Sequence, residues 1–168
     1  MVRIFVSVGS NVDRERHIAL ALDLLRARFG ELQLSSIYES ASVGFDGDPF
    51  FNLVAAFDSD AEPRQIVTAL HEIERRCGRE RDGKHFSPRT MDLDLLLAGE
   101  RVMRDEDIVL PREEISSQAF VLCPLAEIAG ERKHPVSGDT LAVMWARLEG
   151  NAGTLRKVNI GDGADARV

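Results

Sequence analysis

The chain has 168 residues and a formal net charge of −7 at pH 7, with 44% hydrophobic and 29% charged residues. This length can bury the core of one domain, the composition is that of a globular protein, and the acidic balance argues against a general nucleic-acid binder. No apolar run approaches the ~20 residues of a membrane-spanning helix, and the N-terminus lacks the apolar segment of a signal peptide. We therefore expect a cytoplasmic protein without a nucleic-acid or membrane partner.

A strand and a helix open the chain. Apolar residues alternate over residues 2–8, which predicts a strand. Apolar residues at helical spacing then continue to Phe29, and Gly30 ends the predicted helix. Asn11 and Asp13 are both candidates for its N-terminal cap, because either side chain can accept a hydrogen bond from the first turn.

Two further strands are predicted before the next helix. Residues 32–39 alternate again, which puts four side chains on one face, namely Leu32, Leu34, Ser36 and Tyr38. Residues 41–49 are rich in glycine and aspartate, a composition typical of a loop. Residues 50–57 are predicted to form the third strand of the chain.

The middle of the chain combines a helix, a basic segment and an apolar strand. The helix begins near Pro63, where proline suits the first turn, and ends at Gly78. Residues 79–90 are polar and basic without a period, which predicts a second loop. Residues 91–98 form an apolar strand interrupted by two aspartates, and a turn after it is expected to fold residues 101–103 back as a hairpin.

Two helices, over residues 117–128 and 141–148, complete the predicted elements, and residues 161–168 have the composition of a disordered tail. The order strand–helix–strand–strand–helix–strand (βαββαβ) predicts an α+β fold with a ferredoxin-like sheet and helices packed on it. We expect a single domain over residues 1–160.

The strand over residues 91–98 carries the clearest chemical signal. Asp92 and Asp94 are two residues apart, so both side chains leave the same face of the strand, with ~6.5–7 Å between their Cα atoms. Two ionised carboxylates repel unless a cation lies between them, and hard oxygen ligands suit Mg²⁺. A solvated acidic face on an edge strand is the alternative interpretation. Arg89 favours the interpretation as a phosphoryl-transfer site, because such sites usually combine a guanidinium group with two carboxylates.

Positive charge gathers just before this strand, at Arg75, Arg76, Arg79, Arg81, Lys84 and Arg89. In an acidic chain this indicates a small polyanionic ligand, although a solvated helix end followed by a charged loop has the same composition. The sequence has neither a P-loop nor the glycine-rich loop of protein kinases, so ATP would need another mode of binding. Gly9-Ser10 lies too far before Asp92 to give the pattern of a nucleotidyltransferase.

Several longer motifs occur in order along the chain. They are Val8-Gly9-Ser10-Asn11, Tyr38-Glu39-Ser40 with Gly44, Phe50-Phe51-Asn52, Gly78-Arg79-Glu80-Arg81 and, most specific, Pro88-Arg89-Thr90-Met91-Asp92-Leu93-Asp94. In this order and spacing, the chain resembles the 6-hydroxymethyl-7,8-dihydropterin pyrophosphokinase family over roughly residues 2–150. The resemblance implies transfer of pyrophosphate from ATP to the hydroxymethyl group of that pterin, with release of AMP, in folate biosynthesis.

The same resemblance implies a role for individual residues. Two Mg²⁺ ions are implied at Asp92 and Asp94, which form the implied catalytic group together with Arg79 and Arg89. Contacts with the co-substrate ATP are implied for Arg79, Arg81, Arg89, Leu95, Arg112 and Gln118. Contacts with the pterin are implied for Ser40, Val43, Phe50, Asn52 and Phe120. Glu74 is interpreted as structural, holding an arginine of the segment that follows it.

The chain departs from the family pattern at His85, at Phe86-Ser87, and at two positions that bear on ATP binding. Arg112 stands where the family usually has a histidine, and Gln118 stands where it usually has an arginine, and both positions normally contact the ATP phosphates. This leaves a second interpretation, in which the chain is a pterin- or nucleotide-binding paralogue with little catalysis, or a pyrophosphokinase of a related pterin. The presence of Asp92, Asp94 and Arg89 favours the active enzyme.

Overall fold

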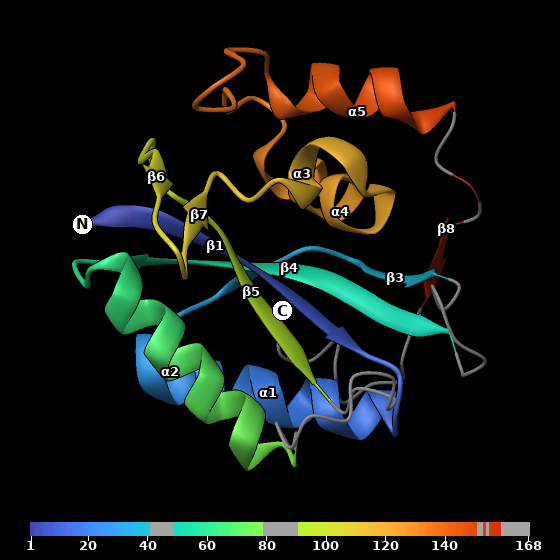
Figure 1. Ribbon diagram of the computed structural model, residues 1–168. Coiled ribbons are helices and arrows are strands. Elements are labelled where there is room, and N and C mark those ends of the chain that lie inside the picture. Colours follow the sequence, from blue (N-terminus) through green and yellow to red (C-terminus); the bar gives the residue numbers. More distant parts are fainter. Residues whose placement is uncertain (41–48, 79–90, 151–152, 154, 159–168) are drawn as a thin grey trace.

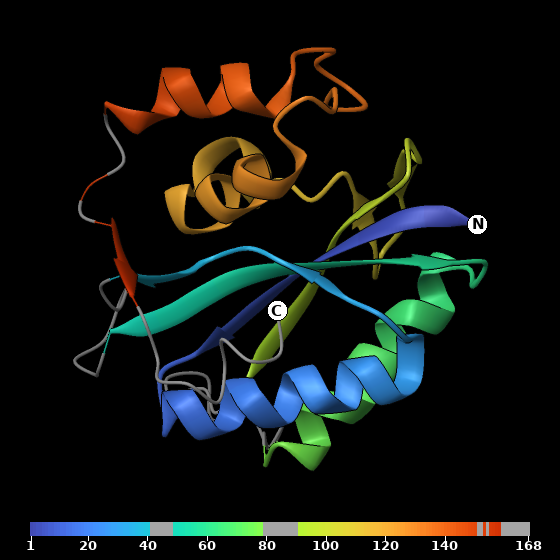
Figure 2. The ribbon, with the colours of Figure 1, turned by 180° about the vertical axis from the view of Figure 1, so that it is seen from behind.

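The computed structural model describes residues 1–40, 49–78, 91–150, 153 and 155–158. One antiparallel sheet lies between two layers of helices (Figures 1 and 2). Helices α1 (Arg14–Phe29) and α2 (Pro63–Arg76) cover one face. Helices α3 (Glu114–Ser117) and α4 (Ala119–Ala129) lie on the other face, and α5 (Leu141–Glu149) packs on the outer side of α4.

The strands of the main sheet are β1 (Val2–Ser10), β2 (Gln33–Leu34), β3 (Ile37–Ser40), β4 (Phe50–Ser59), β5 (Asp92–Ala98) and β8 (Leu155–Val158). Their order is β5-β1-β4-β3-β8, with β2 paired to β4, and every pair is antiparallel. Apart from the short β2, the strands and helices up to β5 follow the predicted βαββαβ order. The prediction of an α+β, ferredoxin-like sheet is therefore confirmed.

The central strand β1 is buried on both faces because helices cover both sides of the sheet. Ile4, Val6 and Val8 belong to the hydrophobic cluster on the α1–α2 face. Phe5 belongs to a second cluster, between the sheet and α4, and is 2% exposed. The predicted alternation over residues 2–8 therefore identified one buried face correctly, while the second face is buried as well.

The segment predicted as one strand over residues 32–39 is two short strands with an extra residue between them. Leu34 pairs with Ala55 and Tyr38 pairs with Asn52, so four steps on this side oppose three on β4. One extra residue reverses the face of every side chain that follows it. Leu34 packs with the α1–α2 cluster, whereas the Tyr38 hydroxyl donates a 2.8 Å hydrogen bond to Glu127 of α4. The prediction that Leu34 and Tyr38 share one face was wrong.

Two predicted elements of the second half also differ in the structure. Strand β6 (Met103–Arg104) pairs with β7 (Val109–Leu110) instead of folding back onto β5. The N–H of Arg112 donates to the carbonyl of Leu96, so the segment after β7 occupies part of the β5 edge that the predicted hairpin would need. The helix predicted over residues 117–128 is α4, which begins at Ala119; the short helix α3 before it was not predicted, and the extended backbone of Gln118 (φ −114°, ψ 114°) separates the two.

The last predicted helix is confirmed as α5, and the Thr140 hydroxyl caps it by accepting a hydrogen bond from the N–H of Val143. Strand β8 was not predicted, and the predicted tail over residues 161–168 lies outside the described residues. Among the helices that the structure describes, none is long and apolar enough to cross a membrane.

Candidate active site

One end of the sheet brings residues from four strands into a single row. Asp92 of β5 lies opposite Gly9 of β1, Gly9 lies opposite Asn52 of β4, and Asn52 lies opposite Tyr38 of β3. Residues that oppose one another on neighbouring strands point to the same face, and for this row it is the α4 face. Asp92 and Asn52 are two strands apart, which corresponds to about 10 Å.

Gly9 keeps the space between Asp92 and Asn52 open. A Cβ atom at this position would lie 3.0 Å from the Oδ1 atom of Asn52 and 3.8 Å from the backbone carbonyl oxygen of Phe51. A side chain here would therefore crowd the sheet and fill the middle of the row. The glycine leaves a gap with a carboxylate on one side and a carboxamide on the other.

The two aspartates of β5 are half-buried, whereas Met91, Leu93 and Leu95 are buried in the cluster on the opposite face. This is the facing that the period of two predicts. Burial in the site raises the pKa of Asp94 to about 6, and repulsion from Asp92 adds to this shift while Arg112 opposes it. The pair therefore concentrates negative charge at one point of the sheet face, which a bound cation would stabilise.

Two further polar side chains lie close to this pair. Glu74 of α2 is 1% exposed, and its Oε2 atom accepts a 2.9 Å hydrogen bond from the N–H of Leu93, between the two aspartates. Its interpretation as structural agrees with this contact; the expected contact with residues 79–90 lies outside the described residues. Ser7 of β1 is 8% exposed and lies opposite Asp94.

Sequence reasoning underestimated both residues, although each carried a signal. Glu74 is a charged residue beside the apolar stripe of its helix, and Ser7 is the polar residue inside an apolar strand. A buried polar group needs a partner, so such positions point to a contact that the structure must supply. For Glu74 that contact fixes the backbone of β5 at the aspartate pair.

A pocket of about 500 Å³ adjoins Asp94, and Leu95 and Arg112 are among the residues that line it. The Arg112 Nη2 atom is 3.4 Å from the Oδ1 atom of Asp94, and its Nε donates to Glu114 at 2.7 Å. Two of the predicted ATP contacts thus lie together beside the carboxylate pair. Gln118 is not among the described lining residues; it lies at the junction of α3 and α4.

The other end of the row carries the predicted pterin contacts. Asn52 is 5% exposed, and its Nδ2 donates a 2.8 Å hydrogen bond to the Ser40 hydroxyl. Phe50 lies opposite Ser40, and Phe120 in the first turn of α4 packs against the second cluster. The remaining predicted site residues, Val43, Arg79, Arg81 and Arg89, lie outside the described residues.

The family model of 7,8-dihydro-6-hydroxymethylpterin-pyrophosphokinase (HPPK) matches residues 5–130. A 2-amino-4-hydroxy-6-hydroxymethyldihydropteridine pyrophosphokinase of Pseudomonas aeruginosa is 38% identical over 79% of this chain and 84% of its own length. A folic acid synthesis protein of Pneumocystis carinii is 30% identical over 86% of this chain, which spans only 20% of that longer protein.

Among solved structures, the wild-type HPPK-DHPS of Plasmodium falciparum superposes with a TM-score of 0.74 at 11% identity. The match covers 95% of this chain and 48% of the Plasmodium chain, and at this identity it supports the fold alone. The family match, which spans most of the chain, and the bacterial relative together lead to one assignment. The chain belongs to the 7,8-dihydro-6-hydroxymethylpterin-pyrophosphokinase family.

Proposed function

We propose that this protein transfers pyrophosphate from ATP to the hydroxymethyl group of 6-hydroxymethyl-7,8-dihydropterin and releases AMP, as a step of folate biosynthesis. Membership of the family supports this activity. The observation that carries it is the row across the sheet, in which Gly9 leaves a gap between the Asp92 carboxylate and the Asn52 carboxamide. The row provides a place for a flat ligand with its reactive end toward the carboxylates.

At the Asn52 end of the row, the site can recognise the pterin ring. A carboxamide offers a donor and an acceptor together, which matches the amide-like edge of a pterin. Ser40 fixes the orientation of this carboxamide through the 2.8 Å hydrogen bond. We assign Phe120 to stacking on the ring, and Phe50 and Val43 to the remaining walls. The hydroxymethyl group would then point toward Asp92 and Asp94.

At the Asp94 end, the pocket of about 500 Å³ is our candidate for the nucleotide. Leu95 supplies an apolar wall and Arg112 supplies a cation beside the carboxylates, where the phosphates of ATP would lie. We assign the further phosphate contacts to Arg79, Arg81, Arg89 and Gln118. Guanidinium groups suit this role because they can donate two hydrogen bonds to one phosphate group.

Asp92 and Asp94 fit a site for Mg²⁺. They offer hard oxygen ligands from one rigid strand, and burial together with repulsion from Asp92 raises the pKa of Asp94, an effect that a bound cation would oppose. No group of three or more His, Cys, Asp or Glu residues that could hold a metal occurs within the described part of the chain. Mg²⁺ commonly uses only one or two carboxylates when phosphate oxygens complete its coordination. Two bound Mg²⁺ ions would neutralise the triphosphate and the charge that develops on it.

The residues of the site orient the reaction. The acceptor hydroxyl forms a new bond to the β-phosphorus of ATP, and the bond to the oxygen shared with the α-phosphate breaks, so that AMP leaves with the electron pair. Asp92 and Asp94 are the carboxylates available to accept the hydroxyl proton. Holding both substrates along one row supplies proximity, which can account for much of the rate enhancement.

An assay of AMP release tests this proposal. With ATP, Mg²⁺ and 6-hydroxymethyl-7,8-dihydropterin, the protein should form AMP and the pterin diphosphate in equal amounts, with no ADP. The contact of Arg112 with Asp94 keeps a second candidate open, a paralogue that binds the substrates without turnover. Binding of both substrates without release of AMP would favour that candidate, and no binding of the pterin would refute both.

We further propose that the protein acts in the cytosol and that its partners are small molecules.

A further inference from the structure

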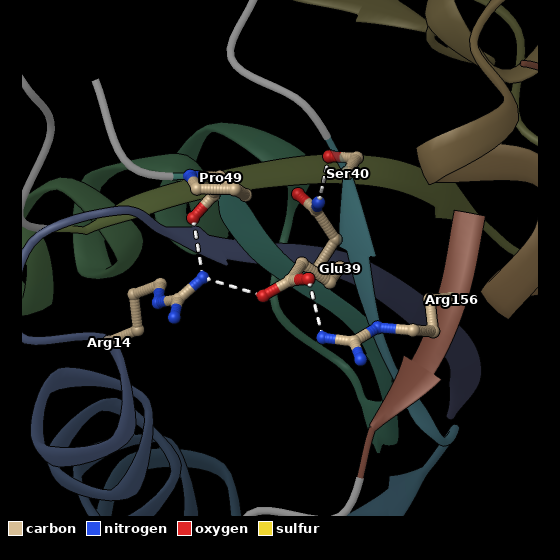
Figure 3. A network of polar contacts seen from close by, with 6 residues as sticks. Arg14, Glu39, Ser40, Pro49 and Arg156 are labelled. Carbon is tan, nitrogen blue, oxygen red and sulfur yellow. Dashed lines mark hydrogen bonds and ion pairs between the residues drawn. The ribbon is translucent and has the colours of Figure 1, made fainter. Parts of the chain in front are cut away.

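Arg14, the first residue of α1, connects two strands behind the proposed pterin site (Figure 3). Its Nη1 donates one hydrogen bond to the Oε2 atom of Glu39 at 3.0 Å and another to the carbonyl oxygen of Pro49 at 2.8 Å. The guanidinium carbon lies 3.9 Å from the ring centroid of Phe51. One side chain therefore contacts the end of β3, the residue that precedes β4, and β4 itself.

Glu39 is held from a second side. Its Oε1 atom accepts a 2.8 Å hydrogen bond from Arg156 of β8 (Figure 3). Hydrogen bonding to Arg156, with a further contribution from Arg14, holds the pKa of Glu39 below its usual range. The carboxylate is only 21% exposed, and each of its oxygens has a guanidinium partner. The end of β3 is thus fixed between α1 and β8.

This network lies directly behind the residues assigned to the pterin. Glu39 pairs with Phe51, and the pairs on either side of it in the ladder are Tyr38 with Asn52 and Ser40 with Phe50. Since alternate residues of a strand point to opposite faces, Glu39 and Phe51 face away from the side that carries Ser40 and Asn52. Strand β3 ends at Ser40 and β4 begins at Phe50, and Arg14 binds a residue beside each of these two strand ends.

We propose that Arg14 is a positioning residue for the pterin. By holding Glu39 and Pro49 together, it sets the relative position of Ser40 and Asn52, whose hydrogen bond orients the carboxamide that recognises the ring. Arg156 completes the arrangement from β8, beyond residue 130 where the family match ends. This inference rests on the proposed function, because it assigns a supporting group to the pterin end of the same site.

Replacing Arg14 by methionine tests the proposal. Arg14→Met keeps a long apolar stem against Phe51 and removes both hydrogen bonds. Loss of charge-assisted hydrogen bonds from the support of the site should weaken pterin binding about tenfold. The KM for the pterin should rise to the same extent, while kcat and the KM for ATP change less than twofold. Binding is measured by fluorescence titration of 6-hydroxymethylpterin in the presence of a non-hydrolysable ATP analogue and Mg²⁺.

Arg3 of β1 offers a matched control at the opposite end of β4. Its side chain is 26% exposed, as is that of Arg14, and it also joins two strands, through Asp58 at 3.2 Å and Gln33 at 2.8 Å. Arg3→Met should leave the affinity for the pterin unchanged. Equal losses in the two variants, or parallel losses for pterin and ATP in Arg14→Met, would mean general destabilisation and would overturn the proposal.

If Arg14→Met does not fold, Glu39→Gln and Arg156→Met probe the same network with smaller changes. Each variant should bind the pterin two- to fivefold more weakly and bind ATP with unchanged affinity. Unchanged pterin affinity in both variants would refute the inference. The wild-type protein separates the two levels of the argument. Failure of the wild type to bind the pterin contradicts the proposed function, whereas normal binding in every variant contradicts only the role of Arg14.

Discussion

Asp94 on β5 and Glu39 on β3 are carboxylates of the same sheet, yet their surroundings move their pKa values in opposite directions. Two guanidinium groups hold Glu39, one on each oxygen, and its pKa is lowered. Asp94 shares its arginine with Glu114 and has Asp92 as a neighbour, and its burial in the site together with this neighbour raises its pKa to about 6. Among the described residues, two cations contact the first carboxylate, whereas the second shares one cation with Glu114, as expected if a ligand neutralises it under the proposed function.

Under the proposed function, this contrast separates a structural ion pair from a functional one. A carboxylate that only holds strands together gains from complete pairing, as at Glu39. A carboxylate that binds a cation must remain incompletely paired in the free protein, and this costs folding free energy. Under the proposed function, the Arg112 contact at 3.4 Å would partly substitute for that cation. The four predictions that follow test this difference, beginning with the largest effect.

Asp92→Asn should lower the turnover rate by several orders of magnitude and leave the fold intact. The change removes one charge of the proposed metal site and keeps volume and polarity, and each tenfold loss of rate corresponds to only about 1.4 kcal/mol. AMP release under saturating Mg²⁺ measures the effect. Asp58→Asn, at an ion-paired position 55% exposed on β4, is the matched control and should retain full activity. Activity of Asp92→Asn within tenfold of wild type would remove Asp92 from the site.

Arg112→His should weaken binding of an ATP analogue roughly ten- to a hundredfold, because a charged phosphate contact is worth ~1.5–3 kcal/mol. We expect that Arg112 supplies the positive charge that Gln118 does not, so that adding Gln118→Arg should restore most of the loss. The three variants form a double-mutant cycle on analogue affinity. Additive effects would show that the two positions act independently, and the compensation would then be rejected.

Asp94→Asn should stabilise the metal-free protein at pH 7 by about 1–2 kcal/mol while it removes activity. The folded pKa of about 6 lies above the value of 3.8 in the unfolded chain. The folded state therefore binds more protons between pH 4 and 6, and wild-type stability falls as the pH rises through this range. A full two-unit shift would correspond to about 3 kcal/mol, and partial exposure of the side chain reduces it. Urea unfolding at pH 4 and pH 7 measures the difference, which should vanish at pH 4.

Glu39→Gln should change stability in the opposite direction and by less, at most about 1 kcal/mol, as expected for partly exposed ion pairs. Because the folded pKa of Glu39 is lowered, its contribution is present above the pKa of the unfolded chain and is lost as the pH falls through the folded value. The same unfolding series gives this result. A more stable Glu39→Gln variant would contradict the assignment of Glu39 as a neutralised, structural carboxylate.

The aspartate pair could be predicted from the sequence because it depends on local geometry. Asp92 and Asp94 are two residues apart in an apolar strand, so their shared face follows from the period of two. The residues that tune the pair could not be predicted in this way. Arg112 reaches Asp94 only because the segment after β7 returns along the β5 edge, a contact that no local pattern encodes.

The contacts around Glu39 could not be predicted from local sequence patterns either. Arg14 and Arg156 are 25 and 117 residues away from Glu39 in the chain. The reversal of faces before Tyr38 depends on an extra residue opposite β4, which only the pairing register reveals. Composition and periodicity predicted most of the elements up to β5 and their order, whereas strand register, the last strand β8 and distant ion pairs required the structure.

The claim that the Asp92–Asp94 pair awaits a cation is tested most directly by calorimetric titration with Mg²⁺ and α,β-methylene-ATP. The wild type should bind the analogue only with Mg²⁺, and at pH 6 binding should release protons, because the cation displaces them from Asp94. Asp94→Asn should lose both the Mg²⁺ dependence and the proton release, while Asp58→Asn should keep them. Equal, Mg²⁺-dependent binding by wild type and Asp94→Asn, without proton release in either, would contradict the account.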